Sequence, residues 1–245
     1  MGARDGVPQG LPDELEYGPG GLAVLYAEEN SRDALFAAMQ RREAYATSGT
    51  RPVLRFFGGW DYPENLCDAS DMVARGYAGG VPMGGDLPQV AQVEGAAKKA
   101  PRFLISASMD MGTPDYPGSP LQRVQVVKGW YENDELHEEV LDVAGGPNDA
   151  SVDLDSCEQS GSGHNQLCTV WQDNNFNPTF PTFYYTRTLE NPSCRWSQRI
   201  CADAGVRCDN PGSIPEGMEG CCAAEHKKVI QERAWTSPIW YTPPA

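Results

Sequence analysis

The chain has 245 residues, with 19 Lys and Arg against 34 Asp and Glu, so its formal net charge is −15. This charge argues against nucleic acid or an anionic membrane surface as the main partner, because both require a basic face. No apolar run approaches the roughly 20 residues of a transmembrane helix, and the first ten residues lack the apolar segment of a signal peptide. With 26 Gly and 20 Pro, the composition indicates a loop-rich globular protein.

The beginning of the chain predicts one strand–helix–strand unit. Residues 1–20 are punctuated by Gly and Pro and predict a loop. The apolar run 21–27 predicts a strand, and the run 52–58 predicts a second one. Short connections to a helix between them favour a parallel pair. Because one such unit cannot cover both faces of its own sheet, residues 1–60 read as the end of a larger α/β domain.

The predicted helix between these strands has a capping residue and an apolar side. Asn30 or Ser31 can cap a helix that runs to about Glu43, with Gly49 beyond its end. The apolar side chains that this helix would turn toward a core are Leu35, Phe36 and Met39.

After Trp60 the pattern changes to short strands. Residues 61–100 look irregular, with a glycine-rich loop at 76–88 whose glycines favour positive φ or close backbone approach. Alternating apolar segments bounded by turn residues then predict an antiparallel, sandwich-like domain over residues 61–245. The predicted fold class is therefore α+β. The expected strands are 102–108, 122–130, 138–143, 167–172, 182–189 and a last one around 235–241.

The eight cysteines favour disulfides and an oxidising compartment. Seven of them follow residue 150, and their spacing contains no CxxC pair of the kind that structural zinc sites use. The adjacent Cys221 and Cys222 suit two different partners, and Cys157 and Cys168 flank one loop and are plausible mutual partners. Cys67 would then pair with a distant cysteine or stay free. The remaining cysteines are Cys194, Cys201 and Cys208.

An acidic stretch offers a possible calcium site. Residues 131–160 contain ten carboxylates and no Lys or Arg. Asp149, Asp153 and Asp155, close to two glycines, are the best candidate ligands, since calcium takes carboxylate and carbonyl oxygens from flexible loops. The complete EF-hand pattern is absent, and a solvated acidic face is the alternative.

Three histidines are present, and none has a second histidine at an HxH or HExxH spacing. His137 lies among carboxylates and would belong either to an acid–base or metal site or to an exposed hairpin end. His226 is predicted on the surface. His164 lies in a loop near Cys157 and Cys168.

No complete active site is visible among the motifs. Glu28 and Glu29 follow the first strand, where parallel α/β domains bind ligands, although acids also stabilise a helix N-terminus there. Arg51, which is a catalytic candidate together with these two glutamates, approaches the second strand from its opposite end. In the later strands, Arg187 with Glu190 and Glu232 with Arg233 are expected to form structural ion pairs rather than to catalyse.

Long motifs in order carry a resemblance to a known family. Residues 18–51, 55–60, 76–88, 121–130, 183–196 and 230–243 resemble the domain-of-unknown-function 3604 family. Its members are bacterial, frequently exported and longer at the N-terminus. Their N-terminal half resembles the polymerase-and-histidinol-phosphatase (PHP) superfamily of metal-dependent hydrolases, which are built on an α/β barrel.

The resemblance implies a C-terminal piece of such a protein. The HxH and Ser-Asp-Thr-His ligand motifs of PHP-like members are absent, so no metal ligand transfers to this chain. Residues 1–60 would end the barrel and residues 61–245 would form an accessory domain. The expected partner is the N-terminal barrel of the same protein with its divalent metal, in the periplasm or outside the cell.

A second hypothesis needs no enzyme. The chain would then be a disulfide-stapled β-domain that binds carbohydrate or another polymer through exposed aromatic side chains such as Trp60, Trp130 and Trp171.

Overall fold

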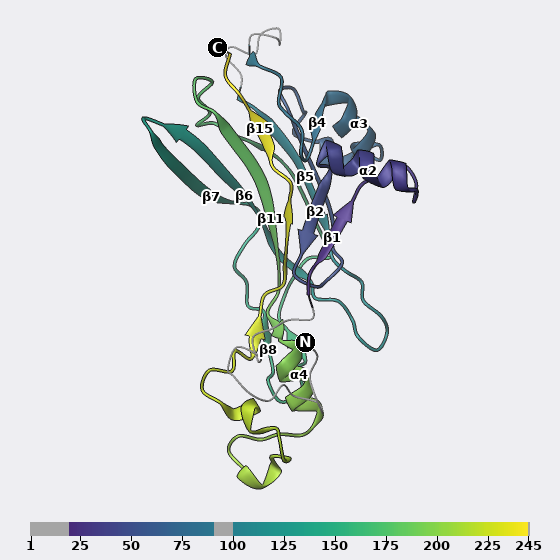
Figure 1. Cartoon of the computed structure of the whole chain (residues 1–245), viewed down its shortest axis with the longest axis vertical. Coiled ribbons are helices and arrows are strands. Elements are labelled where there is room, and N and C mark those ends of the chain that lie inside the picture. The colour runs from purple at the N-terminus through teal and green to yellow at the C-terminus, as the bar shows by residue number, and fades with distance from the viewer. Residues whose placement is uncertain (1–19, 91–99, 245) are drawn as a thin grey trace.

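A computed structural model describes residues 20–90 and 100–244, and it shows an elongated molecule with two stacked sheets above a smaller lobe (Figure 1). The predicted N-terminal loop of residues 1–19 lies outside the described residues. The predicted mixed α+β class with mainly antiparallel sheets is confirmed.

Two antiparallel sheets form the sandwich. The larger one has the order β1-β2-β14-β11-β6-β7, with β15 also paired to β11, and the smaller one has the order β10-β5-β3-β4. The strands of the larger sheet are β1 (Leu22–Leu25), β2 (Ala44–Thr47), β6 (Leu121–Glu132), β7 (Glu135–Gly145), β11 (Thr182–Glu190), β14 (Arg233–Thr236) and β15 (Ile239–Tyr241). Those of the smaller sheet are β3 (Val53–Gly59), β4 (Gly80–Pro82), β5 (Arg102–Ser108) and β10 (Gln166–Gln172).

Short helices and two small hairpins complete the described chain. The helices are α2 (Arg32–Arg41), α3 (Met72–Gly79) and α4 (Trp196–Asp203), with 3-10 turns at Leu66–Asp68, Pro211–Ser213 and Glu219–Cys222. The hairpins pair β8 (Ser151–Val152) with β9 (Gln159–Ser160), and β12 (Ser193–Cys194) with β13 (Val229–Ile230). We call the β8–β9 hairpin and residues 193–230 together the disulfide lobe.

The main core lies between the two sheets. Phe56 and Phe103 of the smaller sheet pack in one cluster with Val126, Tyr184 and other buried side chains of the larger sheet. Leu54 with Phe56, and Val124 with Val126, are core residues two positions apart on one strand, the spacing that turns side chains to one face. Burial of this apolar surface holds the sheets together, at about 25 cal/mol per Å² removed from water.

The predicted parallel βαβ unit is wrong. The strand β1 pairs antiparallel with β2, a strand that lies within the predicted connection, and β3 belongs to the other sheet. Ser31 caps α2 as predicted, since its Oγ accepts the Ala34 amide at 3.3 Å. The helix ends at Arg42 in the left-handed conformation (φ 60°), which sends the chain back at once into β2.

The sheets also continue across the predicted division at residue 60. Strand β2 hydrogen-bonds to β14, and β3 pairs along its whole length with β5. Both layers therefore combine strands from before and after that position.

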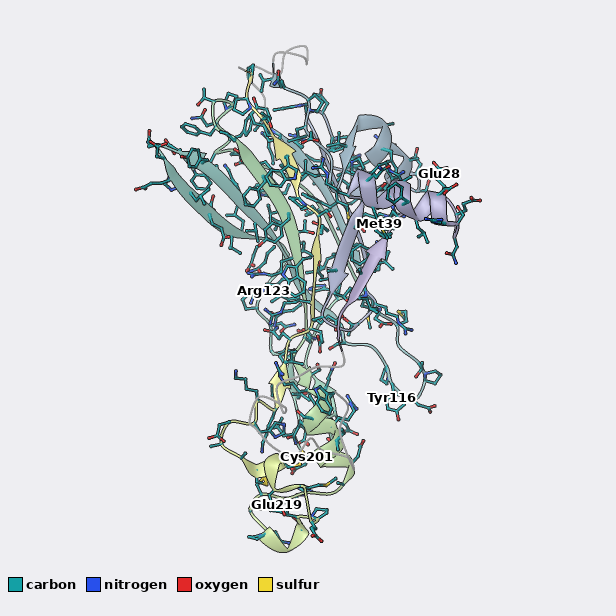
Figure 2. The ribbon with its side chains drawn as sticks, viewed as in Figure 1. Glu28, Met39, Tyr116, Arg123, Cys201 and Glu219 are labelled. Atoms are coloured by element: carbon teal, nitrogen blue, oxygen red, sulfur yellow. A yellow bond between two sulfur atoms is a disulfide. The ribbon has the colours of Figure 1, made fainter. Side chains whose placement is uncertain are left out.

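Of the three side chains of α2 that were predicted to face the core, Leu35 is half-buried and the other two are mostly exposed. Phe36 is 59% exposed and Met39 is 57% exposed, whereas Ala38 is completely buried. Figure 2 shows Met39 on this helix beside the sandwich. The small alanine, rather than the large residues, is the fully buried position of this helix.

The glycine-rich segment 76–88 is partly regular, because it contains the end of α3 and all of β4. Its glycines permit close approach, as expected. A Cβ on Gly76 would lie 2.7 Å from the Phe57 ring, and one on Gly80 would lie 2.1 Å from the Gly58 carbonyl oxygen.

All eight cysteines are paired, in four disulfides. Cys221 and Cys222 have different partners, Cys201 and Cys208, as predicted. The proposed Cys157–Cys168 pair is wrong, because Cys157 bonds Cys194 and Cys168 bonds Cys67. The β10 strand carries Cys168 to the outer face of the smaller sheet, whereas the β8–β9 turn carries Cys157 into the disulfide lobe.

Candidate functional site

An open cleft lies at the end of the sandwich where strand β6 ends. It has a volume of about 340 Å³ and combines aromatic, acidic and carboxamide side chains. We call it the Trp130 cleft. Its lining residues are Lys128, Trp130 and Glu132 from β6, Glu139 from β7, and Asn175, Asn177, Phe180 and Thr182 from the β10–β11 loop and the start of β11.

A buried ion pair forms the floor of this cleft. The Lys128 ammonium lies 2.6 Å from the Asp173 carboxylate, and both side chains are almost completely buried. Lys128 also donates to the Asn175 carbonyl at 3.1 Å, and the Tyr184 hydroxyl donates to Asp173 at 2.7 Å. Burial and the Asp173 charge raise the pKa of Tyr184, so its hydroxyl stays protonated and remains a donor. This network ties the β10–β11 loop to β6 and fixes the shape of the cleft.

The Trp130 side chain is held in one orientation. Its indole N–H donates to Glu132 at 3.2 Å, and its ring stacks on His137 with centroids 5.1 Å apart and an interplanar angle of 15°. Trp130 and His137 are directly opposite each other in the β6–β7 register, as are Lys128 and Glu139. A fixed aromatic ring beside two carboxylates and two carboxamides offers both apolar contact and hydrogen-bonding groups to one ligand.

Sequence reasoning found only part of this cleft. Trp130 was a candidate aromatic, and His137 was expected among carboxylates or at a hairpin end. The floor pair of Lys128 and Asp173 was missed. The sequence does contain a sign of this pair, because no Lys or Arg occurs between Lys128 and Arg187. A single cation beside a long acidic stretch is a good candidate for a buried ion pair.

The other two candidate tryptophans are less open than expected. Trp60 is buried and donates to the Pro88 carbonyl at 3.2 Å. Trp171 is half-buried and stacks on Phe103 with centroids 5.7 Å apart. Both rings pack in the main cluster between the sheets.

A second polar cluster is buried where the sandwich meets the disulfide lobe. Glu190 is 1% exposed, and neither of its carboxyl oxygens has a hydrogen-bond partner among the described residues. Burial raises the pKa of Glu190 to about 7; the Thr50 hydroxyl opposes this rise, and the charges of Glu232 and Asp110 add to it. A carboxyl group in this environment is half protonated near neutral pH.

The two expected ion pairs of this region are not formed. Arg187 donates to Gln125 at 2.7 Å instead of to Glu190. Glu232 accepts a hydrogen bond from the Ser48 hydroxyl, and Arg233 donates to the Gln231 carbonyl at 3.2 Å. The side chain of Arg187 lies on the outer face of β11, whereas Glu190 lies inside, because these positions differ by an odd number of residues.

The three weak catalytic candidates are not brought together. Glu28 and Glu29 are exposed between β1 and α2, as Figure 2 shows for Glu28. In the β1–β2 register, Leu25 pairs with Ala44 and Leu22 with Thr47. The glutamates therefore follow one end of this strand pair, and Arg51 follows the other. The backbone amide of Arg51 donates to Asp110 at 2.9 Å.

The three candidate calcium ligands have other partners. Asp149 accepts the Ser162 hydroxyl and amide, and Asp153 accepts the amides of Asp155 and Ser156. These bonds hold the pKa of both carboxyl groups below the usual value. Asp155 forms an ion pair with Arg207. Within residues 20–90 and 100–244, no group of three His, Cys, Asp or Glu side chains is arranged to hold a metal ion.

His226 is buried, which corrects its predicted surface position. Its Nε2 lies 2.9 Å from the Ser197 hydroxyl and its Nδ1 lies 3.1 Å from the Cys221 carbonyl. Burial lowers the pKa of His226 and so favours the neutral ring, which connects Ser197 and Cys221 inside the disulfide lobe. The backbone of His164 exchanges two hydrogen bonds with Leu121.

Comparison with family models identifies the family of this chain. The family model described as "Protein of unknown function (DUF3604)" matches residues 5–243. No curated protein and no solved structure matches the chain. None of the helices in the described part of the chain has the length and apolar character needed to cross a membrane.

Proposed function

Since this chain belongs to the DUF3604 family of unknown function, we propose that it is an exported accessory domain that binds a hydroxyl-rich ligand, a glycan segment, in the Trp130 cleft. The observation that carries this proposal is the cleft itself. Planar carboxylates and carboxamides form the usual hydrogen bonds to sugar hydroxyls, and aromatic rings contact the apolar faces of the sugar rings.

The charges of the cleft favour a neutral glycan over an anionic one. Glu132 and Glu139 line it, and Lys128, the one cation among its described lining residues, is already bonded to Asp173. A ligand with its own carboxylate or sulfate would meet two uncompensated negative charges. The exposed Asn175 and Asn177 carboxamides can donate to hydroxyl oxygens from the other side of the cleft.

Isothermal titration with cellohexaose and chitohexaose tests this proposal. We expect binding of at least one of these neutral hexasaccharides, at least a tenfold weaker affinity in Trp130→Ala, and wild-type affinity in Trp240→Ala. Trp240 is the matched control, since it is 39% exposed on β15 and does not line the cleft. No binding of either sugar, or equal loss in both variants, would contradict the proposal.

The disulfides support the proposed location outside the cytoplasm. Four of them pair all eight cysteines, and such bonds form and persist in the periplasm or outside the cell. Intact-mass measurement after alkylation of the protein taken from its native cells should show eight blocked thiols before reduction; eight freely alkylating thiols would place it in a reducing compartment.

A second function, as part of a metal-dependent hydrolase, is favoured by the outer face of α2. Phe36 and Met39 are both more than half exposed and lie next to each other on this helix. Two large apolar side chains at i and i+3 suit a packed partner. We propose that they contact the PHP-like barrel of the same protein, whose own residues would hold the divalent metal.

Activity of the joined protein tests the hydrolase proposal. With manganese or zinc, the chain joined to its barrel should hydrolyse p-nitrophenyl phosphate, and the Phe36→Ser/Met39→Ser variant should lower its melting temperature. The same double substitution should leave the melting temperature of the present chain unchanged. A metal-loaded joined protein that is fully inactive on phosphoesters would contradict this function.

A further inference from the structure

The four disulfides differ in how accessible they are. Cys201–Cys221 and Cys157–Cys194 are buried, and Cys67–Cys168 is half-buried against the cluster beneath α3. The structure describes all eight cysteines, and only Cys208 among them is exposed. Cys208 forms its disulfide with the half-buried Cys222. Thiol–disulfide exchange requires a thiolate to reach a sulfur atom, so Cys208–Cys222 is the disulfide that a thiol can attack first.

A cation lies beside the exposed sulfur. The Lys228 ammonium is 3.8 Å from the Cys208 Sγ. The attacking species in exchange is a thiolate, and a fixed positive charge beside the attacked sulfur draws it in and stabilises the charge as the new bond forms. Arg207 lines the same cleft but forms an ion pair with Asp155, so Lys228 is the cation in contact with the disulfide.

The same sulfur borders a cleft with a polar binding group. This cleft has a volume of about 270 Å³. Its polar lining, besides Cys208 and Gln198, consists of two cations, Lys228 and Arg207, and two carboxylates, Asp155 and Asp209. Gln198 is 6% exposed; its Nε2 donates to the Leu154 carbonyl at 2.7 Å, but its Oε1 has no partner among the described residues. A buried carboxamide oxygen without a donor can accept an N–H from a bound amide.

We propose that Cys208–Cys222 is a thiol–disulfide exchange site for a small peptide thiol that carries a carboxylate. Its carboxylate would face Lys228, and its amide N–H would face Gln198. In the step, the thiolate sulfur attacks Cys208 Sγ and forms a new S–S bond. The Cys208–Cys222 bond breaks, and its electron pair leaves with Cys222, which takes a proton from water. The products are a mixed disulfide at Cys208 and a free Cys222 thiol.

The fold keeps this reaction local. Cys201–Cys221 remains closed and buried beside it, and His226 holds the Cys221 carbonyl at 3.1 Å. Opening Cys208–Cys222 therefore frees one loop of the disulfide lobe and leaves the sandwich intact.

The test uses the intact protein with reduced glutathione as the probe. After timed exposure, acid quenching and alkylation, peptide mass spectrometry locates the glutathione and the free thiol. We expect the mixed disulfide at Cys208 and the free thiol at Cys222 well before any change at the other three disulfides. Simultaneous modification of all four, or first modification at Cys67–Cys168, would overturn the proposal.

Two variants test the part played by the cation. Lys228→Met should slow glutathionylation about fivefold, the effect of removing one unit charge at this distance in water, and Lys228→Arg should restore most of the rate. With the neutral 2-mercaptoethanol the loss should be smaller, because that thiol has no carboxylate. Equal rates for wild type and Lys228→Met with both thiols would also overturn the proposal.

Discussion

Replacing Glu190 by glutamine should change how stability depends on pH. The carboxyl group is buried and without a hydrogen-bond partner among the described residues, so its charged form is costly. Its pKa rises from 4.5 to about 7 on folding. The folded state therefore binds this proton more tightly than the unfolded state. The stability contributed by the bound proton is fully present below pH 4.5 and is lost as the pH rises to about 7.

The magnitude follows from the difference between the two pKa values. A pKa difference of about 2.5 between the folded and unfolded states, at about 1.4 kcal/mol for each pKa unit, corresponds to about 3 kcal/mol of unfolding free energy. The glutamine side chain would resemble the protonated carboxyl in shape and carry no charge. Glu190→Gln should therefore match the wild type near pH 4.5 and exceed its unfolding free energy by about 3 kcal/mol at about pH 8.

Urea unfolding with the disulfides intact, followed by tryptophan fluorescence between about pH 4.5 and 8.5, measures this difference. Glu216→Gln is the matched control, since Glu216 is exposed in the disulfide lobe; its difference from the wild type should stay near zero. A Glu190→Gln difference that is the same at both ends of the pH range would refute the reasoning, because it would show that Glu190 titrates alike in both states.

Three further changes test the packing. Asp173→Ala should cost about 3–5 kcal/mol in urea unfolding, because it leaves Lys128 buried without its partner; a loss below about 1 kcal/mol would contradict a buried pair. Cys67→Ala with Cys168→Ala should cost about 4 kcal/mol, because this disulfide closes a 101-residue separation; an unchanged urea midpoint would count against it. Gly76→Ala should cost about 1–3 kcal/mol through contact with Phe57, whereas Gly146→Ala, which meets nothing within 4 Å, should cost little; equal effects would contradict the packing of α3 on β3.

The strands of the sandwich could be predicted from the sequence because their alternation is local. The segments expected at 102–108 and 182–189 correspond to β5 and β11 almost residue for residue. The strand β2 could not be recognised in the same way. Its sequence AYAT is short and weakly apolar, and it becomes a strand because β1 and β14 supply hydrogen bonds on both sides.

Pairings between distant residues were the main source of error. Cys157 and Cys168 are close in sequence, but β10 directs Cys168 toward Cys67 on the outer side of the smaller sheet. Phe36 and Met39 satisfy a helical apolar spacing, yet the fully buried position of α2 is Ala38. Spacing along the chain predicts which residues share a face, but it does not determine which face is covered.

The same limit applies to the candidate site. Trp130 was found by residue type, whereas Lys128 and Asp173 come together only through the packing of β6 against the β10–β11 loop. The glutamates after β1 were placed by analogy with parallel sheets, and the antiparallel pairing of β1 with β2 removes that argument.

The most direct test of the glycan site is an NMR titration of the isotopically labelled chain with cellohexaose and chitohexaose. Binding in the Trp130 cleft predicts concentration-dependent shifts of the Trp130 indole N–H and of the Asn175 and Asn177 side-chain amides, with the Trp240 indole unchanged. Shifts at Trp240 with none at Trp130, or no shift with either sugar, would contradict a glycan site in this cleft.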